Sequence, residues 1–167
     1  MLFRSAVRAR TELAAAIVAA LALFPCAATH AQEAPDVALA VVVAPDAAID
    51  SVSLGDLRRI FLGDRQYTSD RTRITLIVPL PGSAGRATAL RVVYRMREVE
   101  YRQYWVAKIF RTEVFSGPRV ATVEEAKRQV TATRGAIALI PASAVDRSLK
   151  VVVVGGRRPG QPGYELH

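Results

Sequence analysis

Apolar runs alternate with amphipathic stretches along the chain, and this alternation predicts strands separated by helices. The apolar runs are rich in Val, Ile and Leu, as is typical of strands buried on both faces in parallel sheets, and they cover residues 37–43, 74–78, 136–140 and 149–154. The amphipathic stretches predict helices at 53–62, 83–96, 99–110 and 122–133, and a short helical turn at 141–145. The order favours an α/β domain with a mixed, mainly parallel sheet flanked by helices.

Local signals mark where two of these helices begin. Ser53 has the character of an N-cap, with Asp56 in the first turn, and Gly63 ends the helix. Thr122 and Glu125 have the spacing of a capping box. Both signals depend on short-range spacing alone, so we expect one helix to begin just after Ser53 and another just after Thr122.

The first 31 residues have the three parts of a cleavable signal peptide. A positive start (Arg4, Arg8, Arg10) is followed by an uncharged apolar stretch at 13–24 and by small residues before a cut that we place after Ala31. An uncleaved membrane anchor is the alternative, but a spanning helix needs about 20 apolar residues. A lipoprotein anchor at Cys26 is disfavoured because a phenylalanine and a proline precede it. The protein is therefore expected in the periplasm or outside the cell, in a form that does not span the membrane.

Removal of this leader leaves 136 residues, the size of one ordinary domain. The predicted elements place the α/β domain at 32–156. The last segment, 157–167, contains two prolines and two glycines and has no periodic pattern, which predicts a flexible tail.

Residues 32–167 carry 20 Lys and Arg against 14 Asp and Glu. Outside the cytoplasm, a basic balance indicates small anions, acidic polysaccharide or membrane surfaces as partners, ahead of nucleic acid. The arginines are scattered, however, which is also typical of an ordinary solvated surface.

The sequence contains few of the residues on which enzymes depend. Histidine occurs only at His30 and His167, and the one cysteine lies in the leader. A zinc site or a nucleophile paired with histidine is therefore not expected. No glycine pattern of a nucleotide-binding loop is present. We expect a protein that is not an enzyme and uses no metal and no cofactor.

One loop has a physical rationale for binding an anion. Gly82, Ser83, Ala84, Gly85 and Arg86 join a predicted strand to a predicted helix. The first amides of a helix have no intrahelical partner and, with the helix dipole, favour an anion. Small residues let the anion approach, while a hydroxyl and a guanidinium add donors. The alternative is a glycine turn followed by a serine that only caps the helix.

Four segments, taken in order, resemble the phosphate-type substrate-binding proteins of ABC transporters. Residues 54–63, LGDLRRIFLG, are similar to the family segment L-x-x-L-x-x-I-F-x-G and are the most specific of the four. The other three are the strand before it (37–45), the strand with its phosphate loop (74–86) and the strand at 135–140, which is similar to G-A-I-G-Y.

The resemblance implies a periplasmic-binding-protein-like fold of the second type, and only one of the family's two lobes. It also implies a phosphate or similar oxyanion as ligand, because the family loop Arg-x-x-Gly-Ser-Gly-Thr gives its amides, hydroxyls and arginine to phosphate. Gly82, Ser83 and Gly85 match that loop in kind. Ala84 is inserted, the leading arginine is missing, and Arg86 stands where the family has threonine.

Two functions follow as hypotheses. The first is an exported, non-enzymatic phosphate-binding protein of the ABC-transporter type. The second is a lobe without ligand that serves as an interaction module for an envelope sensor or transport partner. For the second, an exposed helix face around Tyr101 and Tyr104 is the expected contact surface, with Trp105 in the core.

Overall fold

The computed structural model describes residues 37–167, which belong to one compact unit, Ala34–His167. The predicted signal peptide and its cut after Ala31 lie outside the described residues. The strands are β1 (Leu39–Val43), β2 (Ser51–Val52), β3 (Thr75–Pro79), β4 (Arg119–Ala121), β5 (Ala136–Pro141), β6 (Lys150–Val151) and β7 (Val153–Val154). The helices are α2 (Leu54–Phe61), α3 (Ala84–Thr88), the π-helix η2 (Ala89–Tyr94), α4 (Glu98–Phe110), α5 (Val123–Ala132) and the 3-10 turn η3 (Ala142–Ala144).

Five strands form the main sheet, in the order β4-β3-β5-β1-β6. β3 runs parallel to β4 and β5, whereas β1 runs antiparallel to β5 and β6. β2 and β7 form a separate parallel pair. The expected α/β class with a mixed sheet is confirmed, but β1 itself is not a parallel strand. Its continuous apolar run reflects burial on both faces, which an antiparallel central strand shares with a parallel one.

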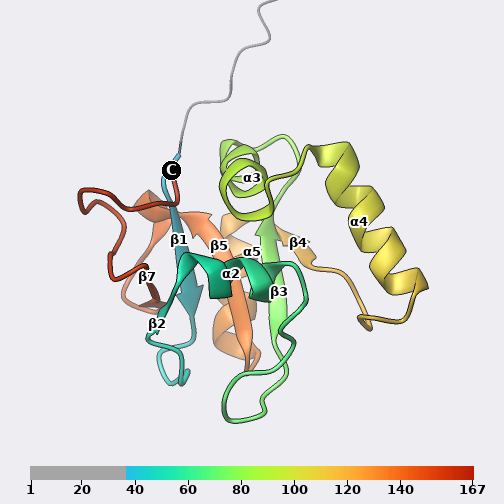
Figure 1. Ribbon diagram of the computed structural model, residues 1–167. Helices are drawn as coiled ribbons and strands as arrows, with labels where there is room; N and C mark the ends of the chain where they lie inside the picture. The colour runs from blue at the N-terminus through green and yellow to red at the C-terminus, as the bar shows by residue number, and fades with distance from the viewer. Residues whose placement is uncertain (1–36) are drawn as a thin grey trace, which may run out of the picture. The chain divides into compact units, whose positions relative to one another are not determined.

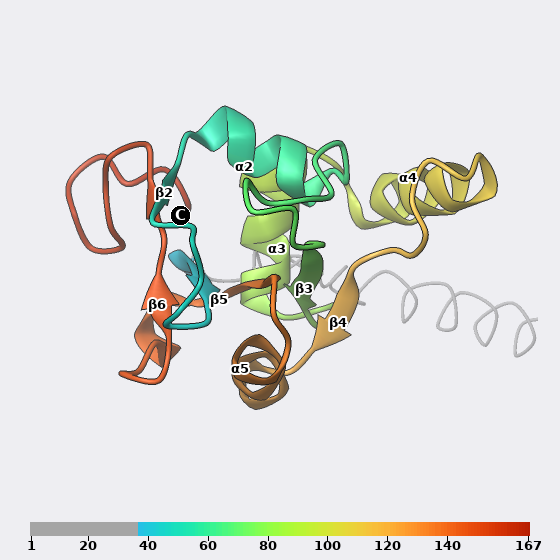
Figure 2. The same ribbon diagram turned by 90° about the horizontal axis from the view of Figure 1, so that it is seen from below.

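Helices cover both faces of the sheet. Figures 1 and 2 show α2 and α3 on one face and α5 on the other. Successive residues of β1 alternate between two cores: Leu39 and Val41 pack on the side of α2, and Ala40 and Val42 on the side of α5. This alternation is the two-residue period of a strand with apolar residues on both faces.

The predicted helix starts are confirmed. The Ser53 hydroxyl accepts a hydrogen bond of 3.0 Å from the Asp56 amide, and Thr122 and Glu125 form the expected capping box. The helix expected at 83–96 changes character: α3 continues as the π-helix η2 and ends at Arg95, which has φ +54°. The short strands β2 and β4 are additions that the sequence pattern did not predict.

The segment 157–167 packs on the domain, in contrast to the flexible tail expected from its composition. Tyr164 and Leu166 are buried at 2% and 0% exposure. The Tyr164 hydroxyl donates to the Leu39 carbonyl (2.7 Å), and the Leu39 amide donates to the Leu166 carbonyl (2.8 Å). The compact unit therefore extends past residue 156. Within residues 37–167, no helix has both the length and the apolar character needed to cross a membrane.

Candidate functional site

The predicted anion loop lies between β3 and α3, and its serine is already engaged. Gly82 occupies the turn at φ +80°, a backbone conformation that favours glycine. The Ser83 hydroxyl donates to the Leu80 carbonyl (2.7 Å) and accepts from the Arg86 amide (3.1 Å). Because a hydroxyl has one proton, it cannot also donate to an anion while the first bond holds. Ser83 acts here as a helix cap.

Arg86 is buried, and its guanidinium, which the sequence suggested as a donor for an anion, is paired within the protein. Arg86 is 2% exposed. Its Nε and Nη2 each donate a hydrogen bond of 3.0 Å to the Glu98 carboxylate. The guanidinium also lies 4.0 Å from the centre of the Tyr101 ring. The pairing partner comes from α4, twelve residues along the chain, where no local pattern could reveal it.

The ion pair changes the pKa of both partners. The hydrogen bonds from Arg86 lower the pKa of Glu98 below its ordinary value, although partial burial opposes this. Burial acts to lower the pKa of Arg86, but the bonds to Glu98 outweigh it and the pKa is raised. Both groups are therefore charged at neutral pH, and the positive charge of Arg86 is compensated inside the protein.

Two tyrosines complete this buried cluster. The rings of Tyr94 and Tyr101 meet edge to face, 4.7 Å between centres. Burial raises the pKa of Tyr94 well above its ordinary value. Among residues 37–167, neither the Tyr94 hydroxyl nor Nη1 of Arg86 has a hydrogen-bond partner. The cluster connects η2 to α4, so Arg86 serves to hold helices together.

A cavity of about 270 Å³ lies beside the anion loop, beyond the carboxyl ends of β3, β4 and β5; we name it the carboxyl-edge pocket. Open α/β sheets bind ligands at this edge. Its lining is made of Val37, Pro79, Leu80, Ser83, Ala84, Gly85, Ala121, Thr122, Val123, Ala126, Leu139, Ile140 and Pro141. This lining contains no charged residue. Gly85 is buried against Leu39 and Pro79, with its would-be Cβ 3.4 Å from the Leu39 side chain.

The helix start on the other side of this pocket is also internally capped. Both the amide and the hydroxyl of Thr122 donate to the Glu125 carboxylate, at 2.9 Å each. These hydrogen bonds lower the pKa of Glu125, which therefore stays ionised at neutral pH. A negative charge at the start of α5 disfavours an anion beside Thr122. The pocket thus combines an apolar wall with two occupied helix caps.

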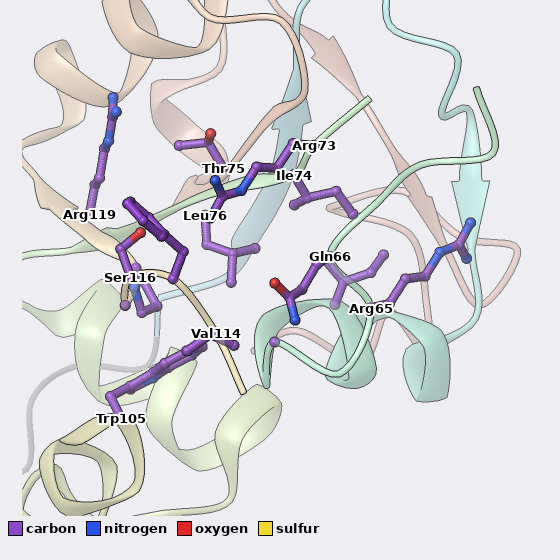
Figure 3. A pocket seen from close by; sticks show the side chains of 15 residues that line it. Arg65, Gln66, Arg73, Ile74, Thr75, Leu76, Trp105, Val114, Ser116 and Arg119 are labelled. Carbon is purple, nitrogen blue, oxygen red and sulfur yellow. The ribbon is translucent and has the colours of Figure 1, made fainter. Parts of the chain in front are cut away.

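A second cavity, of about 220 Å³, lies at the opposite end of the sheet, where β3 and β4 begin. Three arginines line it together with apolar side chains such as Trp105 and Val114. Figure 3 shows that Arg65 and Arg119 extend to opposite sides of the view, and Arg73 lies 5.0 Å from the centre of the Phe115 ring. Arg65 and Arg119 therefore do not point toward one another in this view.

The aromatic face of α4 is turned inward, which corrects the expected contact surface. Tyr101 and Trp105 are each 6% exposed, so the core position expected for Trp105 is confirmed. The Tyr104 hydroxyl donates to the Leu62 carbonyl (2.7 Å). Lys108, which sequence reasoning did not single out, is 6% exposed; it donates to the same carbonyl and forms an ion pair with Asp64.

Comparison with solved structures identifies the fold. The chain superposes on a phosphate ABC transporter substrate-binding protein of Clostridium perfringens, solved with bound phosphate, with a TM-score of 0.58, 18% identity and coverage of 72% of this chain and 46% of that one. An ABC-type phosphate transport receptor of Vibrio cholerae superposes with a TM-score of 0.58 and 16% identity, over 74% of this chain and 48% of that one. PstS of Borrelia burgdorferi superposes with a TM-score of 0.57 and 16% identity, over 74% of this chain and 49% of that one.

No family model and no curated protein matches the chain. The likeness is therefore one of fold, at low sequence identity. The chain spans about half the length of each of these three solved proteins. It has the α/β fold seen in phosphate-type substrate-binding proteins of ABC transporters, over about half of their length.

Proposed function

We propose that this chain is an exported, non-enzymatic module that uses the substrate-binding fold to recognise a partner protein of the cell envelope. The carboxyl-edge pocket is its recognition site. One observation carries the proposal: the pocket lining contains no charged residue, and the neighbouring Arg86 is buried in an ion pair with Glu98. A site built for tight phosphate capture would present that charge to the ligand.

The chemistry of the pocket suits an apolar anchor. A cavity of about 270 Å³ with an apolar wall accepts one large apolar side chain. Leu80, at the rim, is 42% exposed and adds apolar surface for a partner to cover.

Export rests on the amino-terminal sequence. Arginines, an uncharged apolar stretch at 13–24 and small residues before position 32 stand in the order of a secretory leader. Export would bring the module into contact with envelope sensors or transport proteins. Mass spectrometry of the protein recovered from the periplasm tests this step, because cleavage after Ala31 predicts a mature chain that begins at Gln32.

Site-specific crosslinking tests the recognition site. A photoreactive residue at Leu80, on the pocket rim, is expected to capture one envelope protein in living cells. The control position is Tyr67, which is 56% exposed and does not line the pocket. A product at position 80 and none at position 67 supports the proposal. Equal capture at both positions, or no capture at position 80, contradicts it.

A second candidate function is oxyanion binding at Gly82, Ser83, Ala84, Gly85 and Arg86, with delivery to an ABC transporter. The fold shared with a protein solved with bound phosphate favours it. So do the first-turn amides of α3, which need a partner from outside the helix. In this second function, the backbone amides of Ala84 and Gly85 donate to the anion, because the side chains of Ser83 and Arg86 are already bonded within the protein.

A thermal-shift titration with phosphate and sulfate separates the two functions. A ligand at 100 times its dissociation constant stabilises a protein by about 2.7 kcal/mol. A saturable shift that is lost in Ala84→Pro, which removes a backbone donor at the first helical position, where proline is tolerated, would establish the anion site. Recognition of a protein partner predicts no saturable shift with either anion.

A further inference from the structure

Helix α4 has two apolar faces, and only one of them packs on the domain. The inner face carries Tyr101 and Trp105, both buried in the core. Val99, Val106 and Phe110 follow at intervals of seven and four residues, which places them together on the opposite face. Their exposed fractions are 53%, 68% and 87%. We name these three residues the outer stripe of α4.

The outer stripe lies on a helix at the margin of the domain. Figures 1 and 2 both show α4 to one side of the sheet, beyond β4. Ile109, 42% exposed, adds apolar surface beside the stripe. A contiguous exposed apolar surface on a helix indicates a binding function more strongly than isolated exposed residues do.

The charges around the stripe are basic or compensated. Arg102 is exposed and lies between Val99 and Val106 along the helix. The acidic residues of α4, Glu98 and Glu100, are held in ion pairs by arginines of the domain. Glu113, just past the helix, is likewise paired with Arg111. Residues 32–167 carry 20 Lys and Arg against 14 Asp and Glu, a net charge of +6, so this apolar stripe is presented on a basic protein.

We propose that the outer stripe of α4 binds the surface of an anionic lipid bilayer. Phe110 and Val106 enter the boundary between headgroups and acyl chains, with the helix axis in the plane of the membrane. The Arg102 stem lies along the acyl region while its guanidinium reaches the lipid phosphates. The basic charge of the domain adds long-range attraction to the anionic surface.

Charge favours this occupant over the two alternatives. A second copy of the chain would bring two strongly basic domains together, which electrostatic repulsion opposes. In a dry groove of a protein partner, Arg102 would require a matching carboxylate, because burial of an unpaired charge is unfavourable. At a bilayer surface the phosphates supply that counter-charge without a specific geometry.

Vesicle sedimentation tests the proposal with residues 32–167, which contain the whole compact unit. The full chain is unsuitable, because its apolar stretch at 13–24 would bind lipid independently of α4. The probes are vesicles of phosphatidylcholine alone and vesicles that also contain phosphatidylglycerol. We expect binding to the anionic vesicles only, weakened by about 0.5 M salt because salt screens the attraction.

Matched variants assign the binding to the stripe. Phe110→Ser and Val106→Ser are expected to weaken partition into anionic vesicles by about tenfold each. Val120→Ser is the control, because Val120 is 47% exposed but lies on β4. Thermal melting verifies that every variant is folded.

Several results would overturn the inference: no difference between the two vesicle types, unchanged binding of Phe110→Ser, or equal losses in Phe110→Ser and Val120→Ser. Loss of a crosslinked protein partner in Phe110→Ser, without vesicle binding by the wild type, would assign the stripe to protein recognition and also overturn it. The vesicle result is independent of the carboxyl-edge pocket, so the proposed function and this inference can fail separately.

Discussion

The Arg86 guanidinium donates two hydrogen bonds of 3.0 Å to the Glu98 carboxylate, one from Nε and one from Nη2. The arginine side chain is 3% exposed and the glutamate side chain 34%. A planar guanidinium facing a carboxylate in this way gives a strong and directional ion pair. It fixes the start of α4 against α3 and removes the one cation of the predicted anion loop from solvent.

Loss of this pair should destabilise the fold more than loss of a surface pair. Arg86→Gln leaves the Glu98 carboxylate without its partner in a partly buried position, and we expect unfolding to become easier by about 2 kcal/mol, discounted for the exposure of Glu98. The matched control is Arg97→Gln, which removes the exposed pair with Glu100 and should change little. Urea denaturation measures both. Similar losses in the two variants would mean that Arg86 contributes nothing beyond a surface ion pair.

The same pair predicts how stability depends on pH. The pKa of Glu98 in the folded protein lies below its ordinary value of 4.5. Its contribution is therefore complete above about pH 4.5 and is lost as the pH falls through the lower folded pKa. Melting temperatures of wild type and Glu98→Gln should converge on acidification below about pH 4.5. A constant difference between pH 7 and pH 3 would exclude this linkage.

Two glycines with similar backbone angles should respond very differently to alanine. Gly135 has φ +79°, and an added Cβ would overlap the backbone carbonyl of Arg73. Gly82 has φ +80°, and an added Cβ would have no atom within 4 Å. Gly82→Ala should therefore lower the free energy of unfolding by about 1 kcal/mol, through backbone strain alone. Gly135→Ala adds steric overlap and should lower it by at least about 3 kcal/mol.

Chemical denaturation of the two glycine variants measures this difference. If both variants lost the same stability, the close approach of Arg73 to Gly135 would not be a feature of the folded protein in solution.

The buried end of the chain gives a fourth prediction. Leu166 is fully buried in the core on the α2 side. Leu166→Ala should lower the free energy of unfolding by about 3 kcal/mol, as truncation of a buried leucine generally does. His167→Ala, one residue further and exposed, is the control. Equal stability of the two variants, by thermal or urea unfolding, would contradict docking of the segment.

Features encoded by neighbouring residues were predictable from the sequence. The caps at Ser53 and Thr122 depend on a side chain and an amide three residues apart, so the spacing alone identifies them. The apolar runs identified the central strands because both faces of those strands are buried. The strand direction of β1 was not predictable, since burial on both faces gives the same pattern in either direction.

Features that depend on distant partners were missed. Nothing near Arg86 indicates that Glu98 of another helix will cover it. The pattern of α4 contains two apolar stripes, and only the packed structure distinguishes the buried Tyr101 from the exposed Phe110. The final segment looked unstructured because two anchors, Tyr164 and Leu166, stand among glycines, prolines and charges. Whether Gly82, Ser83 and Gly85 bind an anion stays a prediction.

The contact between Leu39 and Leu166 has a consequence for how this unit can be joined to other chains. Its first strand and its final residues are hydrogen-bonded to each other, so the two ends of the described chain emerge side by side (Figure 1). A domain of this kind can be carried as an insert within a longer polypeptide through two short connections. It also suits circular permutation, with a short linker across the old ends and new ends opened in the surface loop around Asp70.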